Sequence, residues 1–65
     1  MKNPIKTLNN KGITYEQMAK LTGLHINTIY NIANYTPKQC GNMTVFNVIL
    51  IKEKLKIDLW KYFKQ

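Results

Sequence analysis

Two short helices hinged at a glycine, within residues 14–32, are the feature that most constrains how this chain folds. Thr14 and Gln17 have the spacing of a capping box, in which each side chain satisfies a backbone donor at the start of a helix. Gly23 follows at the point where a left-handed residue ends a helix and turns the chain sharply. The pattern therefore predicts a helix to about Thr22 and a second helix from about Ile26 to Asn34.

Apolar residues of the two predicted helices recur at helical spacing. They predict a shared core, made by Met18, Leu24, Ile29 and Ile32. Ala19 is small enough to sit where the two helices cross. His25 falls at the N-cap of the second helix, where Ser or Thr would be a better cap.

Three further helices are predicted from capping residues and stop signals, which makes the chain all-α with five short helices. They are a helix capped by Asn3 that starts at Pro4 and stops at Gly12, one capped by Thr44 that reaches Leu55, and one capped by Asp58 over 59–64. A polar loop, 36–42, precedes the longest of them.

The helix after Thr44 is rich in β-branched residues, which also suit a strand. The segment is too long and lacks alternation, so a helix is the better interpretation. Its residues approximate an i, i+3, i+4 rhythm, and the apolar ones are expected to face the core: Val45, Val48, Ile49, Ile51 (with Lys52 as the alternative at that step) and Leu55.

Charge is the most unusual aspect of composition. Sixty-five residues fit one domain, 1–65, and the 45% hydrophobic content is ordinary for a globular protein. Ten lysines against three acidic residues give a net charge of +7, which favours a polyanionic partner. The alternative is that an A·T-rich genome enriches Lys, Asn and Ile in any protein that it encodes.

Several classes of function are disfavoured by what the sequence contains. Cys40 is alone, so neither an intramolecular disulfide nor a Cys-rich metal site is expected. The longest apolar run, 48–51, is too short to cross a bilayer. Glu16, Glu53 and Asp58 are the only carboxylates, and no nucleophile stands beside a base. We expect no enzyme, no cofactor or metal, no small-molecule substrate, and a cytoplasmic, nucleoid-associated location.

The order of these elements carries a family resemblance. Its strongest matches are Met18-Ala19, Gly23-Leu24, Asn27-Thr28-Ile29 and Ile32, followed by the closing segment 55–63. With them, the whole chain resembles the Cro/C1-type (XRE-like) helix-turn-helix family of phage repressors and small bacterial regulators. The resemblance implies a lambda-repressor-like DNA-binding domain with its helix-turn-helix at the second and third helices, and a homodimer that binds double-stranded DNA to repress transcription.

By matching position, the resemblance also implies contact residues on DNA. The base-reading set is Ile26, Asn27, Tyr30 and Asn31. The set at the ends of the reading helix or on the phosphate backbone is Tyr15, Gln17, Lys20, His25, Asn34, Thr36, Lys38 and Gln39. Asn makes paired hydrogen bonds to adenine and Ile contacts the thymine methyl group, so an A·T-rich operator is expected.

Two departures from the family pattern leave alternatives open. The expected reading helix has neither Lys nor Arg, so it either reads A·T-rich DNA or binds a protein, as an antirepressor or an inhibitor of a host defence complex does. Five lysines gather in the last fifteen residues, either as a solvated face or as a wider phosphate footprint. Trp60 either folds over its own core or, with Phe63, anchors a dimer interface.

Overall fold

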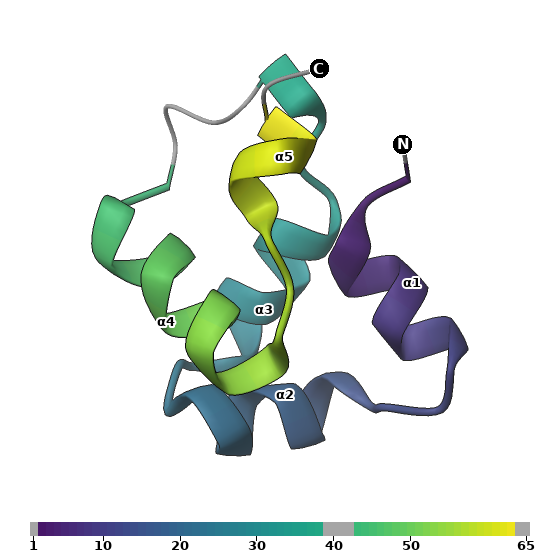
Figure 1. Cartoon of the computed structure of the whole chain (residues 1–65). Coiled ribbons are helices and arrows are strands. Elements are labelled where there is room, and N and C mark those ends of the chain that lie inside the picture. Colours follow the sequence, from purple (N-terminus) through teal and green to yellow (C-terminus); the bar gives the residue numbers. More distant parts are fainter. Residues whose placement is uncertain (1, 39–42, 64–65) are drawn as a thin grey trace.

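Five α-helices make up the fold, and the computed structural model describes residues 2–38 and 43–63 (Figure 1). They are α1 (Pro4–Asn10), α2 (Tyr15–Thr22), α3 (Ile26–Ala33), α4 (Val45–Leu55) and α5 (Leu59–Phe63). No strand occurs in the described ranges, so the predicted all-α class and helix order are confirmed there. The expected last residue of α5, Lys64, lies outside them.

The start of α2 and the turn to α3 follow the predicted local chemistry. Gln17 N–H donates to Thr14 Oγ1 over 3.1 Å, and Thr14 N–H donates to Gln17 Oε1 over 2.9 Å, which completes the capping box. Gly23 ends the helix with a φ of 76°, and its N–H donates to Ala19 O over 2.8 Å. Thr22 then accepts from Leu24 N–H at 3.2 Å, so hydrogen bonds fix the short turn on both sides of the glycine.

The other helix starts also use the predicted caps. His25 Nδ1 accepts from Asn27 N–H at 3.1 Å, and Thr44 Oγ1 accepts from Asn47 N–H at 3.1 Å. Asp58 Oδ1 accepts from Trp60 N–H at 3.0 Å at the start of α5. Because each cap acts within three residues of itself, the sequence is enough to locate it.

The core joins residues from every helix. Ile5, Met18, Ile29, Ile51 and Leu59 are completely buried. The remaining buried apolar residues are Ile32, Ala33, Val48, Leu55, Ile57, Tyr62 and Phe63. The core expected of α2 and α3 is therefore confirmed, with Leu24 and Ala19 packed at its edge.

The prediction that Val45 and Ile49 of α4 face the core is wrong. Val45 is 58% exposed and Ile49 is 48% exposed, whereas Val48, Ile51 and Leu55 are buried. At 3.6 residues per turn, the three buried residues share a narrow stripe, and Val45 and Ile49 lie roughly a quarter turn or more away from it. The early part of α4 therefore carries more apolar residues than one side of a helix can bury.

Hydrogen bonds from both ends of the fold converge just beyond α3. The Asn3 side chain is buried, caps α1, and donates through Nδ2 to Ile32 O at 2.8 Å and to Tyr35 O at 3.1 Å. The Tyr62 hydroxyl of α5 donates to the same Tyr35 oxygen at 2.7 Å. The C-terminal end of α3 is therefore held by the first and the last helix together.

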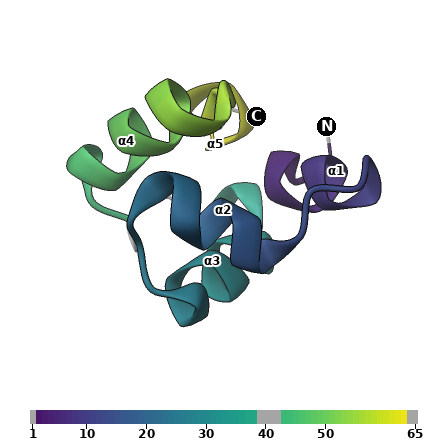
Figure 2. The ribbon, with the colours of Figure 1, turned by 90° about the horizontal axis from the view of Figure 1, so that it is seen from below.

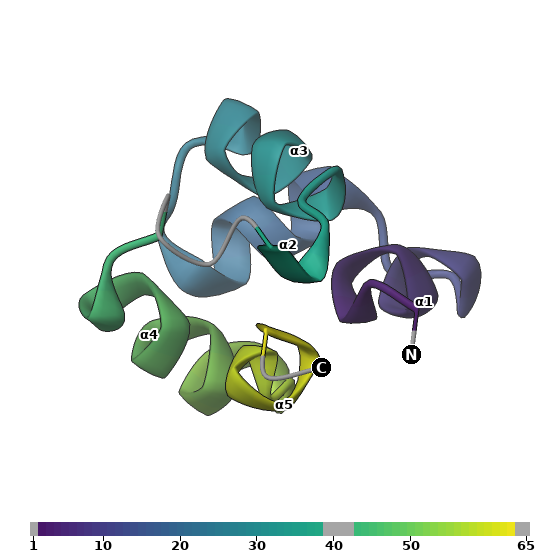
Figure 3. The ribbon, with the colours of Figure 1, turned by 90° about the horizontal axis from the view of Figure 1, so that it is seen from above.

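The arrangement leaves one side of α3 uncovered. Figures 2 and 3 show α2 between α3 and α4, with α5 on the α4 side and α1 at one end. Among the described residues, the main packing partners of α3 are α2 and α1, and both lie on its inner side. Within the described residues, no helix combines the length and the apolar character that crossing a bilayer requires.

Candidate functional site

The outer face of α3 carries a stripe of polar side chains. Asn27, Tyr30, Asn31 and Asn34 are all exposed, while Ile29, Ile32 and Ala33 point into the core. Ile26, the remaining expected reader, is half-buried at the start of the helix. Spacings of three and four residues place the exposed members on one side of the helix. The structure therefore brings the predicted base-reading residues together on a single surface.

Tyr30 is held against α2 at one margin of this stripe. Its ring lies 4.9 Å from the ring of Tyr15, centroid to centroid, at an interplanar angle of 64°. This is the edge-to-face geometry that aromatic pairs favour. Tyr30 nevertheless remains 45% exposed, so the contact fixes the ring while leaving part of it open to a partner. The pair also joins a predicted base reader to a predicted backbone contact.

The two residues at the ends of α3 make bonds within the helix. Through the cap described above, His25 Nδ1 is already an acceptor for a backbone donor, which leaves Nε2 as the nitrogen able to donate outward. Asn34 Nδ2 donates to Tyr30 O at 2.9 Å. Both residues stabilise the ends of α3, and any contact with a ligand is an addition to that role.

The predicted backbone contacts occupy two different segments. Gln17 and Lys20 are exposed on α2, and the Gln17 carbonyl oxygen is engaged in the capping box. Thr36 and Lys38 are exposed on the segment after α3. Gln39 lies outside the described residues. Lys20 and Lys38 are therefore the described cations that the prediction places around the stripe.

Glu16 is a feature of this surface that the sequence interpretation missed. It is exposed in the first turn of α2, next to Tyr15, where its negative charge interacts favourably with the helix dipole. A phosphate approaching the same turn would meet that charge. Its position two residues after the capping residue Thr14, in the first turn of the predicted helix, was the signal that could have identified it.

Exposed apolar side chains gather on α4 rather than on α5. Phe46 is 71% exposed and joins Val45 and Ile49 on one side of α4, a group that we call the α4 apolar face. Trp60 is 37% exposed, so its ring is partly covered by the fold and partly open to solvent, and both alternatives for its role remain. Phe63 is only 9% exposed. Its predicted place in a dimer interface is not supported by its position, because the core already covers its ring.

The described residues hold no group of three or more His, Cys, Asp or Glu side chains that could bind a metal ion. Their buried polar side-chain atoms all have hydrogen-bond partners. Comparison of the chain with protein-family models, with curated proteins and with solved structures finds no match. The surfaces of the protein are therefore the features from which a function can be inferred.

Proposed function

We propose that the protein is a DNA-binding transcriptional regulator in which α2 and α3 act as a helix-turn-helix. The polar stripe of α3 is the observation that carries the proposal. In the proposed complex with DNA, α3 reads base edges in the major groove, and α2 lies across the phosphate backbone. This is the arrangement that the Cro/C1-type resemblance implies, with repression by occupation of an operator.

The chemistry of the stripe favours A·T-rich sites. Asn27 and Asn31 present amide groups, which pair with the N6 and N7 atoms of adenine. No residue of α3 carries the guanidinium or ammonium group that commonly reads guanine. The net charge of +7 supplies a sequence-independent attraction that decreases as salt increases. Binding to chromosomal DNA would place the protein at the nucleoid.

A homodimer completes the proposal, because two reading helices separated by about one turn of DNA recognise a palindromic site. The α4 apolar face and Trp60 are exposed apolar groups able to bury surface between two copies, and Leu21 of α2 is a further exposed apolar side chain. Of these, Phe46 has the largest exposed fraction and is the proposed anchor.

A selection of bound sequences from a random duplex pool tests the proposal, followed by titration of the selected site with Asn31→Ala. We expect Asn31→Ala to weaken binding to that site by about 1–3 kcal/mol and to leave binding to random duplex nearly unchanged. Asn47→Ala, an equal truncation on α4, is the matched control. Equal weakening on every sequence would contradict the assignment of Asn31 as a base reader.

A second candidate function is a protein-binding module on the same fold, such as an antirepressor or an inhibitor of a host defence complex. Two observations favour it. The outer face of α3 has no charged residue, and the α4 apolar face is exposed like a hydrophobic anchor that lacks its partner.

Titration of random duplex DNA at two salt concentrations discriminates between the two functions. A DNA-binding regulator retards random duplex at low salt and loses affinity steeply as salt rises. Lack of retardation at low salt would favour the protein-binding module and overturn the primary proposal.

A further inference from the structure

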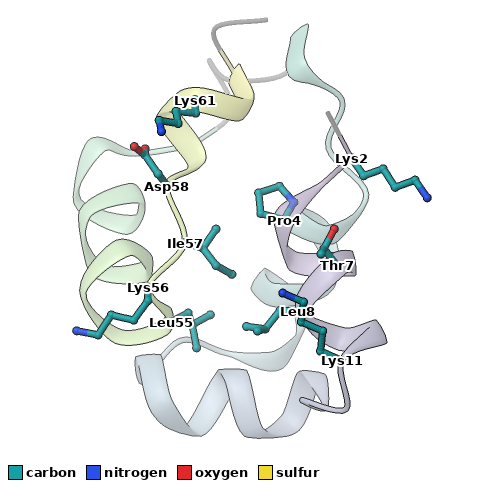
Figure 4. Close-up of a pocket in the computed structure, with 10 residues that line it drawn as sticks. All are labelled: Lys2, Pro4, Thr7, Leu8, Lys11, Leu55, Lys56, Ile57, Asp58 and Lys61. Carbon is teal, nitrogen blue, oxygen red and sulfur yellow. The ribbon is translucent and has the colours of Figure 1, made fainter.

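A groove on the side of the molecule away from α3 has a chemistry of its own. It lies between α1 and the connection from α4 to α5, and has a volume of about 380 Å³ (Figure 4). That volume falls within the range of small-ligand pockets, about 300–1,000 Å³. The lining residues are Lys2, Pro4, Thr7, Leu8, Lys11, Leu55, Lys56, Ile57, Asp58 and Lys61.

The interior of the groove is apolar. Figure 4 shows Pro4 and Leu8 on the α1 side, opposite Leu55 and Ile57 on the other side. Leu55 and Ile57 also belong to the core, so this wall is anchored by the packing of the whole fold. A hydrocarbon or aromatic group placed here would lose its contact with water on both sides, which is the main source of affinity for an apolar ligand.

The margin of the groove is positively charged. Four lysines surround it and Asp58 is its single carboxylate, so the lining has an excess of three positive charges. In Figure 4 the ammonium group of Lys11 lies beside Leu8, while the side chains of Lys2 and Lys56 extend outward from the groove on opposite sides, so each would have to turn inward to reach a ligand. Lysine has a flexible four-carbon stem that brings its charge to a ligand while covering apolar surface. The groove thus combines an apolar interior with cationic ends.

Lys56 occupies a backbone conformation that does not suit it. Its φ of 60° and ψ of 36° are left-handed, and it is the one described non-glycine residue with a positive φ. Glycine or asparagine adopts this conformation at a helix end with less strain than lysine. A lysine at this position is therefore not explained by the backbone. Its place on the margin of the groove supplies a reason.

We propose that this groove binds a small organic anion, a carboxylate with a short apolar tail. The tail lies between α1 and residues 55–57, and the carboxylate interacts with Lys11 and Lys56. The site goes beyond the proposed DNA contact, because it is built from α1 and the α4–α5 connection rather than from the stripe of α3. Its occupancy is measured without DNA, so its failure is independent of the failure of the proposed function.

Three probes added to uniformly ¹⁵N-labelled protein test the proposal by nuclear magnetic resonance: sodium octanoate, octanol and sodium sulfate. We expect octanoate to shift the amide signals of Leu8, Lys56 and Ile57 in a saturable manner, with a dissociation constant of about 1 mM. Octanol has the tail alone and sulfate the charge alone, so each is expected to bind at least about tenfold more weakly, a free-energy difference of about 1.4 kcal/mol.

Two lysine variants locate the charge, with a control outside the groove. Lys11→Met and Lys56→Asn are each expected to weaken octanoate binding about two- to fivefold, the range of a single exposed ion pair. Asn tolerates the left-handed backbone, so Lys56→Asn keeps the fold. Lys54→Asn removes the same charge from an exposed position on α4 that does not line the groove, and is expected to leave binding unchanged.

Several results would overturn the proposal. The first is that octanoate causes no saturable shifts, and the second is that sulfate or octanol binds as tightly as octanoate. The others are equal losses of octanoate affinity in Lys54→Asn and Lys56→Asn, and shifts centred on the α4 apolar face. Each of them would show that the lysines and apolar residues do not act together as one site in this groove.

Discussion

Helices α3 and α4 are built by the same local rules, yet their outer faces differ in kind. Both begin at a side-chain cap, and both bury a stripe of Ile or Val residues. The outer face of α3 presents amides and a tyrosine, whereas α4 begins with exposed Val45 and Phe46. Periodicity therefore determines which residues a helix buries. The chemistry of the remaining face is free to serve a partner.

The difference between the buried and the exposed side of α4 is tested most strongly by truncating one isoleucine on each side. Ile51→Ala removes a fully buried side chain and is expected to lower the free energy of unfolding by about 2–5 kcal/mol. Ile49→Ala, the same truncation on the exposed side, is expected to change it by less than about 0.5 kcal/mol. Urea denaturation monitored by circular dichroism measures both.

Ile51→Val serves as a milder variant if Ile51→Ala does not fold, with an expected loss of about 1 kcal/mol. Equal losses for Ile49→Ala and Ile51→Ala would mean that the two sides of α4 are not distinguished by burial.

The next largest loss of stability is expected where Asn3 bonds the C-terminal end of α3. Asn3→Ala removes the α1 cap and both donors to the carbonyl oxygens of Ile32 and Tyr35. The expected loss is about 1–3 kcal/mol of unfolding free energy, because the buried Ile5 N–H loses its acceptor and the carbonyl oxygens of Ile32 and Tyr35 each lose one of their donors. Asn31→Ala, an equal truncation on the outer face of α3, should change stability by under about 0.5 kcal/mol. Thermal unfolding of the two variants side by side provides the measurement, and similar melting temperatures would refute it.

The N-caps of α3 and α4 are expected to have smaller effects on the free energy of unfolding. Thr44→Ala is expected to cost about 1 kcal/mol at the start of α4, since it removes the acceptor for Asn47 N–H. His25→Ser replaces a less favoured cap at the start of α3 and is expected to stabilise the protein by about 0.5 kcal/mol. Chemical denaturation measures both changes in unfolding free energy, which are expected to have opposite signs. A loss of stability in His25→Ser would indicate that the imidazole also contributes packing contacts.

Phe46→Ser is expected to change stability by under about 0.5 kcal/mol, because the ring is 71% exposed. If the α4 apolar face joins two copies, the same variant lowers the average mass in sedimentation equilibrium to that of one chain. Trp60→Ser is the matched variant on α5. Dimers that persist in Phe46→Ser but are lost in Trp60→Ser would place the interface on α5 instead.

Local signals explain how much of the fold was predictable. The capping box of Thr14 and Gln17, the left-handed Gly23 and the cap at Asp58 all act within a few residues, and the structure has each of them. The bonds of Asn3 to Ile32 and Tyr35 span 29 and 32 residues, so no local pattern indicates them. Asn3 was predicted as a cap only, and its second role depends on how the helices pack.

The candidate site also has features that local patterns predict and features that depend on how the helices pack. The exposed stripe of α3 follows from helical periodicity, whereas the sequence left two alternatives for Trp60, whose ring is 37% exposed. The contact of Tyr15 with Tyr30 was not predictable, because it depends on the crossing of α2 and α3. The α4 apolar face was missed because a rhythm of five apolar residues was assigned to one side. Ile49 lies about 100° around the helix from Val48, on a side of α4 that no described helix covers, so Val48 is buried and Ile49 is 48% exposed.

The shared acceptor at Tyr35 has a consequence for how the fold closes. Its carbonyl oxygen receives one donor from 32 residues earlier in the chain and another from 27 residues later. Contacts of such separation form late, because a chain must lose loop entropy before it gains them. In addition to the apolar core that joins the helices, this one peptide group couples both extremities to the middle of the chain. Release of either extremity in a native-state fluctuation therefore weakens the attachment of the other, and hydrogen exchange in α1 and α5 should respond together.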